Sequence, residues 1–276
     1  MSEQSTLNGS RADLLDNGQW HLAINISSTG IGAWLVPDRN LGRAPRTIME
    51  ETWKDSDEGL LLRIENAVYD NPTVLDDYSA DIIIECDRQL WLPSNLYPSD
   101  DDCAEAYVSV YGGDIFDVIV NDLGEEKVAF CLTPGLRSFM QRSFSGARIW
   151  SQQSLLKEAA MQPHDACKCL VDIREENFDL VLLDRGRFLC AATHPWKTPS
   201  DIAYSLINTL ETYEVSTKDT EIVFSGLREI RQGLGKTLSA YMKSVSQKNH
   251  DLDGKTIPSA VYLAINRITK HANHQR

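Results

Sequence analysis

The sequence predicts an α/β fold built from two similar units, each with the element order β-β-β-α-β-α. The first observation is a set of three short segments in the second half that are rich in strand-forming residues: Cys167–Ile173, Phe178–Asp184 and Arg187–Thr193. The second is a helical segment after them, followed by a fourth strand at Glu221–Phe224 and another helix. The third is a similar order in the first half. This order is that of the ribonuclease-H-like class, which includes the actin-like folds.

The second half supports this reading element by element. Arg185 and Gly186 join the second and third strands as a tight turn, in which the glycine supplies a positive φ. Thr198 or Ser200 then opens a helix that runs to about Tyr213. The last helix is expected from Leu227 to about Val245, which completes the unit.

The first half shares the element order without sharing residues. Its strands are expected at Trp20–Ile26, Ile31–Val36, Thr47–Trp53 and Asp81–Cys86, with a turn at Ser27–Gly30. Asp57 or Ser56 can cap a helix that runs to about Tyr69, because Asn71-Pro72 stops it. A common order without common residues is typical of an ancient internal duplication.

Further elements lie between and after the two units. They are a strand-like segment at Leu90–Pro93, a helix from Asp101 or Asp102, a hairpin of Phe116–Val120 with Lys127–Leu132, a helix opened by Pro134, a helix at Ser151–Met161 and a final helix at Ser259–Ala272. The predicted domains are a disordered tail (1–18), a first lobe with an inserted hairpin and helices (19–165), a second lobe (166–246), and a linker with a C-terminal helix (247–276).

The net charge of −13 is unevenly distributed. Residues 50–126 hold 21 acidic and three basic residues, a net −18, whereas residues 226–276 hold nine basic and three acidic residues, a net +6. The acidic balance argues against nucleic acid as the main partner. We expect the basic C-terminal segment to lie on the acidic half of this molecule or of a second copy. No apolar run approaches a membrane span and the polar start is not a signal peptide, so we expect no membrane insertion and a cytoplasmic location.

No residue pattern points to a metal site or a catalytic centre. The six cysteines and six histidines lack metal-ligand spacing, and there is no Gly-x-Ser-x-Gly elbow. The segment Gly233–Thr237 is similar to the end of a P-loop, but Ile230 stands where the first P-loop glycine is needed. We therefore predict no catalytic residue and no metal ligand, and we interpret this segment as part of a helix.

Four segments together resemble a known bacterial family. They are Leu90–Asn95 (LWLPSN), Lys127–Leu136 (KVAFCLTPGL), Phe178–Tyr204 and Ile222–Gly226 (IVFSG). The family is described as domain of unknown function 3822, and the resemblance covers most of residues 20–245. It implies an actin-like ATPase fold with two ribonuclease-H-like lobes and no established activity.

The resemblance indicates where a nucleotide cleft would lie. Actin-like ATPases hold ATP between two lobes, and the first hairpin of each lobe presents Asp-x-Gly to the phosphates and Mg²⁺. The first turn here is Asn25-Ile26-Ser27, without the aspartate or the glycine, and the second is Asp172-Ile173-Arg174, with a cation in place of the glycine. The adenosine loop keeps one glycine. The predicted positions of this vestigial nucleotide cleft are Asn25, Ser27, Gly30, Asp172, Arg174, Ser225 and Gly226.

These degenerate loops favour a non-catalytic scaffold or protein-interaction module with no cofactor, an unidentified protein partner, and a homodimer as a further option. The alternative is an ATP-binding switch or ATPase with unorthodox phosphate loops, for which ATP and Mg²⁺ would be the cofactors. Three of these positions also have a purely structural interpretation. Asn25 would bond to neighbouring backbone, Asp172 would pair with Arg174 or Arg187, and Gly226 would serve as a turn glycine.

Overall fold

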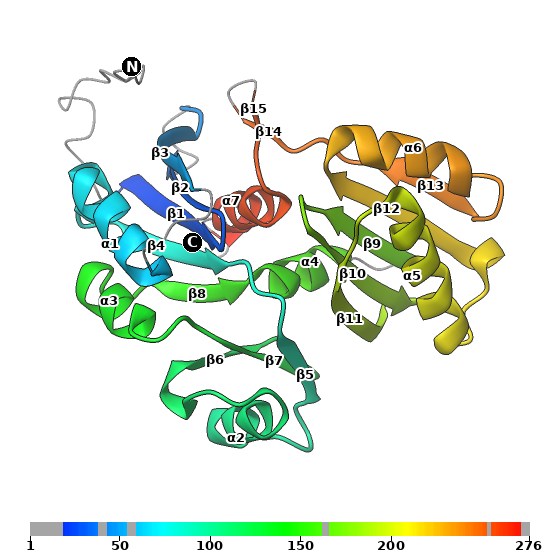
Figure 1. Cartoon of the computed structure of the whole chain (residues 1–276), viewed down its shortest axis with the longest axis horizontal. Helices are drawn as coiled ribbons and strands as arrows, with labels where there is room; N and C mark the ends of the chain where they lie inside the picture. The colour runs from blue at the N-terminus through cyan, green and yellow to red at the C-terminus, as the bar shows by residue number, and fades with distance from the viewer. Residues whose placement is uncertain (1–18, 38–42, 54–58, 162–165, 253–254, 272–276) are drawn as a thin grey trace.

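Two five-stranded sheets face each other across a shared layer of helices in the computed structural model, which describes residues 19–37, 43–53, 59–161, 166–252 and 255–271 (Figure 1). The strands are β1 (Trp20–Ser27), β2 (Gly30–Pro37), β3 (Arg46–Thr52), β4 (Ser79–Ile84), β5 (Gln89–Pro93), β6 (Val118–Asp122), β7 (Glu126–Cys131), β8 (Arg148–Ser151), β9 (Cys167–Ile173), β10 (Asn177–Asp184), β11 (Arg187–Pro195), β12 (Thr220–Gly226), β13 (Ser244–Gln247), β14 (Asp251–Leu252) and β15 (Lys255–Thr256). The helices are α1 (Leu60–Asp70), α2 (Asp100–Tyr111), α3 (Leu136–Ser143), α4 (Gln152–Ala160), α5 (Pro199–Thr212), α6 (Arg228–Leu238) and α7 (Ser259–His271).

The two sheets have the same topology. The first has the order β3-β2-β1-β4-β8 and the second has the order β11-β10-β9-β12-β13. In each, the first strand of the unit pairs antiparallel with the second and parallel with the fourth. The predicted duplication of ribonuclease-H-like units is therefore confirmed at the level of strand order and direction.

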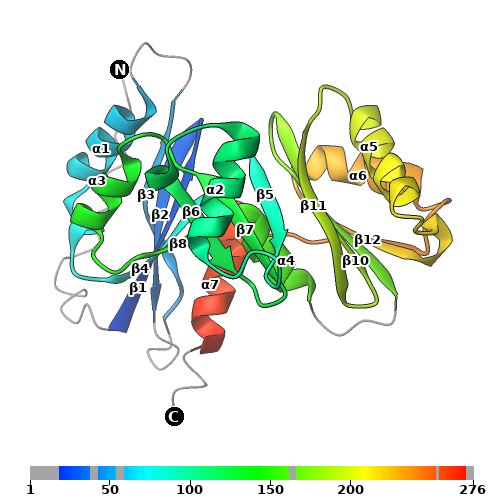
Figure 2. The same ribbon diagram turned by 90° about the horizontal axis from the view of Figure 1, so that it is seen from below.

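Apolar side chains on both faces of each large sheet are buried under helices. The outer face of the first sheet packs on α1 and α3, and the outer face of the second packs on α5 and α6. Between the sheets lie α4 and α7: Leu155 and Val261 pack on the first sheet, and Leu156 packs on the second (Figure 2). The molecule therefore has five layers, in which helices and sheets alternate and helices form the two outer layers and the middle one. This arrangement follows because each helix packs its apolar side against a sheet.

A smaller sheet is inserted into the first half of the chain. Its order is β5-β7-β6, and α2 covers one face of it (Figure 2). Ser99 and Asp102 form a capping box at the start of α2, where the acidic first turn complements the helix dipole. The Trp91 ring on β5 lies 4.6 Å from the Phe188 ring on β11, so the inserted sheet also contacts the second lobe.

Local signals in the second half are confirmed. Arg185 and Gly186 have φ values of 49° and 81°, as a type I′ hairpin turn requires. Thr198 caps α5 through a box with Asp201, and Pro199 occupies the first turn of the helix. These signals could be read from the sequence because each depends only on residues close together in the chain.

Other boundaries differ from the prediction. The last helix of the second unit ends at Leu238, not near Val245, and Val245 lies in β13, which extends the sheet beside β12. The third helix begins after Gly135, a residue in the left-handed region, and not at Pro134. The suggested caps Ser56 and Asp57 lie outside the described residues, as does the predicted tail at 1–18; α1 begins after Gly59.

The basic C-terminal segment is divided between the lobes: α6 and β13 belong to the second lobe, and only the later residues lie on the first lobe of the same chain. Helix α7 packs on Ala23, Trp34 and Ile83, and Lys255 forms an ion pair with Glu50 at 3.2 Å. No helix in the described part of the chain is long and apolar enough to span a membrane.

Candidate functional site

A cleft of about 660 Å³ lies between the two lobes, beyond the carboxyl ends of β1 and β9. This edge of an open α/β sheet is where ligands usually bind. Six of the seven positions predicted from the sequence line the cleft: Asn25, Ser27, Gly30, Asp172, Arg174 and Gly226. The seventh, Ser225, contacts the cleft through Asp172, to which its hydroxyl donates a hydrogen bond.

Asp172 is buried and held by two serine hydroxyls. Ser225 on β12 donates to its Oδ1 at 2.6 Å, and Ser259, the first residue of α7, donates to the same oxygen. The predicted ion pair of Asp172 with Arg174 or Arg187 is wrong, because Arg174 turns to other carboxylates and Arg187 lies 3.9 Å from Asp184. The one aspartate that matches the ATPase pattern is therefore already engaged by the protein itself.

Arg174 joins the two lobes. Its Nη1 lies 3.5 Å from the Glu85 carboxylate of the first lobe, and its Nη2 lies 3.1 Å from Asp179 of the second. Burial would lower the pKa of Arg174, but Asp179 and Glu85 together raise it, so the guanidinium stays charged. Burial raises the pKa of both carboxyls, and Arg174 opposes that rise.

Asn25 takes part in the same network through its side chain, and not through the neighbouring backbone as expected. Its Nδ2 donates to Glu85 Oε1 at 2.9 Å. This bond fixes the orientation of the amide, because Glu85 can only accept there. The Asn25 Oδ1 is then left without a hydrogen-bond partner among the described residues, although Asn25 is only 6% exposed.

Two glutamines at the start of α4 form further hydrogen bonds where the lobes meet. Neither was predicted from the sequence. Gln152 Nε2 donates to the Cys86 carbonyl at 2.6 Å, and Gln153 Nε2 donates to Asp179 Oδ1 at 3.2 Å. Gln153 Oε1 also accepts from Trp91 Nε1 at 2.8 Å. Nothing in their sequence context marks them, apart from the helix start at Ser151, because their partners are 26 or more residues away.

Most of the charged side chains that line the cleft are acidic. Among the described lining residues, seven are acidic and two are arginines, and none is a lysine. The acidic residues are Glu50, Glu51, Glu85, Asp87, Asp172, Glu175 and Glu176. Such a lining favours cationic groups over anionic ones.

Gly226 has a structural role, as its turn interpretation predicts. Its φ is 82°, and a Cβ at this position would lie 1.9 Å from the Ile173 carbonyl oxygen. Gly233–Thr237, the near P-loop, lies inside α6, which confirms the helical interpretation. Among the residues that the structure describes, no group of three or more His, Cys, Asp or Glu side chains is placed to hold a metal ion.

Comparisons with known proteins agree with this fold. Residues 10–245 match the model of a family described as Protein of unknown function (DUF3822). No curated protein matches the chain in sequence. A protein of Bacteroides thetaiotaomicron, described as having an actin-like ATPase fold and unknown function, is similar over 92% of this chain and 98% of its own, with 17% identity and a TM-score of 0.77.

A component of the PilM-PilN type IV pilus biogenesis complex is also similar, with 12% identity and a TM-score of 0.51, over 83% of this chain and 88% of its own. These likenesses show an actin-like ATPase fold, as the sequence predicted.

Proposed function

The chain belongs to the family Protein of unknown function (DUF3822), and we propose that it uses the actin-like ATPase fold as a non-catalytic scaffold that binds a protein partner. The observation that carries this proposal is the position of Arg174. Its side chain lies in the cleft where a phosphate loop would present a glycine, and it is already paired with Glu85 and Asp179.

The network around Arg174 also opposes the motion that an ATPase of this architecture needs. Nucleotide turnover commonly involves opening and closing of lobes around the ligand. Here the opening would break the Arg174–Glu85 ion pair and the hydrogen bond from Gln153 to Asp179. These contacts favour one arrangement of the two lobes.

The charge of the cleft disfavours a nucleotide. Mg-ATP keeps a net negative charge, and the seven acidic lining residues would repel it. Two of them are offset by ion pairs, Glu50 by Lys255 and Glu85 by Arg174. The unpartnered Asn25 Oδ1 can accept a hydrogen bond from an ammonium or guanidinium group. We therefore propose that the partner presents a segment rich in lysine or arginine.

A protein-binding use of this fold has a precedent in the PilM-PilN type IV pilus biogenesis complex. The alternative function, an ATP-binding switch, is favoured by the size of the cleft. A volume of about 660 Å³ is within the usual range of small-molecule sites, and Ser27 and Gly30 still border it.

Thermal melting with and without 5 mM Mg-ATP distinguishes the two functions. A ligand at 100 times its Kd stabilises a protein by about 2.7 kcal/mol, which raises the melting temperature by several degrees. The scaffold proposal predicts no reproducible rise. A rise that is lost in Asp172→Ala would overturn the proposal in favour of the switch.

The partner chemistry has its own test. Fluorescent decapeptides of alternating lysine and glycine, or glutamate and glycine, are titrated into the protein at low salt. The cationic peptide is expected to bind, and Glu175→Gln/Glu176→Gln at the exposed cleft rim is expected to weaken it, whereas Glu211→Gln on α5 leaves binding unchanged. Light scattering of the free protein shows whether the partner is a second copy.

A further inference from the structure

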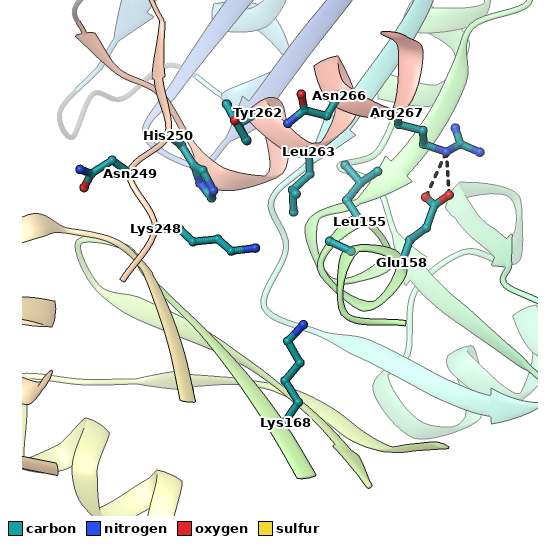
Figure 3. A pocket seen from close by; sticks show the side chains of 11 residues that line it. Leu155, Glu158, Lys168, Lys248, Asn249, His250, Tyr262, Leu263, Asn266 and Arg267 are labelled. Atoms are coloured by element: carbon teal, nitrogen blue, oxygen red, sulfur yellow. Dashed lines mark hydrogen bonds and ion pairs between the residues drawn. The ribbon is translucent and has the colours of Figure 1, made fainter. Parts of the chain in front are cut away.

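A second cavity, of about 700 Å³, lies further along α7 on the seam between the lobes (Figure 3). The start of α7 borders the acidic cleft, and its later residues border this cavity. Leu155 of α4 and Leu263 of α7 form an apolar part of the lining. The second lobe contributes Lys168 on β9, and the segment after β13 contributes Lys248 and His250.

The charge of this cavity is opposite to that of the cleft. The side chains of Lys168 and Lys248 extend into the same open space (Figure 3), and neither forms an ion pair with another described residue. Burial and the neighbouring Lys248 lower the pKa of Lys168, and Glu221, its partner in register on β12, opposes that fall. Glu221 is not among the residues that line the cavity, in which the two lysines face the same space.

Arg267 adds a third cation with spare hydrogen-bonding capacity. Its Nε pairs with Glu158 at 3.0 Å and its guanidinium lies 4.0 Å from the centre of the Trp150 ring. Its Nη1, however, is buried and has no hydrogen-bond partner among the described residues. Glu158 is the one acidic residue among the described lining residues, and this ion pair already engages it.

His250 is an independent observation that points to a ligand site. It is only 5% exposed, and its ring stacks on the Tyr262 ring at 4.4 Å between centroids. Its Nδ1 is buried without a hydrogen-bond partner among the described residues. Burial lowers the pKa of His250, so the neutral imidazole can donate or accept one hydrogen bond at this atom. Buried polar atoms of this kind are normally satisfied.

We propose that this cavity binds a small organic molecule that bears a phosphate group. The phosphate lies between Lys168 and Lys248, whose two positive charges match a dianion. The organic part lies against Leu155 and Leu263, beside the stacked His250 and Tyr262 rings. The volume is within the range of small-molecule sites and exceeds the space that inorganic phosphate alone would fill.

Calorimetric titration of phenyl phosphate into the whole protein at low salt tests the proposal. We expect phenyl phosphate to bind more tightly than inorganic phosphate, because only the ester contacts the apolar lining, and more tightly than phenol, because only the phosphate meets the lysines. The variant Lys168→Gln/Lys248→Gln is expected to bind phenyl phosphate at least tenfold more weakly. The matched variant Lys197→Gln/Lys218→Gln, which changes two exposed lysines elsewhere on the second lobe, keeps the wild-type affinity.

Three results would overturn the proposal. They are no binding of phenyl phosphate at 10 mM, equal affinity for phenol, and equal weakening in the two double variants. Lys248→Gln alone changes an exposed side chain, so its intermediate loss of affinity checks the result in a variant with an undisturbed fold. Unchanged melting temperatures of the variants without ligand show that folding is not the cause.

Discussion

The Arg174 guanidinium lies 3.5 Å from the Glu85 carboxylate, and this ion pair crosses from the second lobe to the first. Arg174 is two residues after Asp172, at the position where the phosphate loop of an actin-like ATPase has glycine. The residue that replaces the glycine of the actin-like pattern is therefore also the one that connects the lobes. Stability measurements can test this junction and the packing around it.

Replacing Arg174 with alanine is expected to lower the free energy of unfolding by about 3–5 kcal/mol, because Glu85 and Asp179 would stay buried without their cation. Urea denaturation measures the change. Arg187→Ala is the control. The Arg187 side chain is exposed and forms a long ion pair of 3.9 Å with Asp184, so we expect the free energy of unfolding to change by less than about 0.5 kcal/mol. Equal effects in the two variants would contradict the role given to Arg174.

Replacing Gly226 with alanine is expected to destabilise the protein by more than about 3 kcal/mol, because the new Cβ would collide with the Ile173 carbonyl and φ is positive. Gly233 is the matched control in the next helix. A Cβ added at Gly233 would enter open space, so Gly233→Ala should stabilise α6 by about 0.5–1 kcal/mol. Thermal melting of both variants should therefore show shifts of opposite sign.

Asp81 makes the stability of the first sheet dependent on pH. Burial alone would raise the pKa of Asp81, but the hydrogen bonds from His21 and Trp150 and the charge of Arg148 hold it below its ordinary value. A carboxyl with a lowered folded pKa stabilises the protein above its unfolded pKa of about 3.9 and loses that contribution as the pH falls towards its folded pKa.

The variant Asp81→Asn is accordingly expected to be destabilised by about 1–3 kcal/mol at pH 7, and the difference from the wild type should shrink below about pH 4. Urea denaturation from pH 7 to pH 3 measures it. Asp77→Asn, at an exposed neighbouring position, should follow the wild-type curve throughout. A difference between wild type and Asp81→Asn that stays constant with pH would show that the charge of Asp81 is not the cause.

Trp91 and Phe188 should be energetically coupled, because their rings lie 4.6 Å apart between the inserted sheet and the second lobe. A double-mutant cycle with Trp91→Ala and Phe188→Ala should give a coupling energy of about 0.5–1.5 kcal/mol. A cycle of Trp91→Ala with Tyr204→Ala, an exposed residue on α5, should give none. The absence of coupling in the first cycle would mean that the two lobes respond separately.

The sequence predicted the parts of the fold that depend on local pattern. The Arg185-Gly186 turn and the Thr198 cap are determined by adjacent residues, and the strands with long apolar runs were placed within a few residues. Strands β8 and β13 were missed because four residues give too short a pattern, and each becomes a strand only beside the neighbour that it extends.

The sequence indicated which residues lie at the candidate cleft, but not which residues they interact with. Matching the loops to an ATPase pattern placed Asn25 and Asp172 at one site, and both residues line the same cleft in the structure. The partners Glu85 and Ser259 could not be inferred, because they lie 60 and 87 residues away in the chain and meet these side chains only through packing of the lobes. The basic cavity was missed for the same reason: Lys168 on β9 and Lys248 after β13 become neighbours only when their strands assemble beside β12 in the second sheet.

Helix α7 follows both large sheets in the chain, yet it fills the layer between them. During synthesis from the amino end, both sheets leave the ribosome before the helix that covers Ala23, Trp34 and Ile83. The part of the first sheet that α7 covers therefore remains exposed until residues 259–271 arrive. The contacts of α7 between the lobes thus form late in synthesis. The two outer cores can form before the lobes reach their final arrangement.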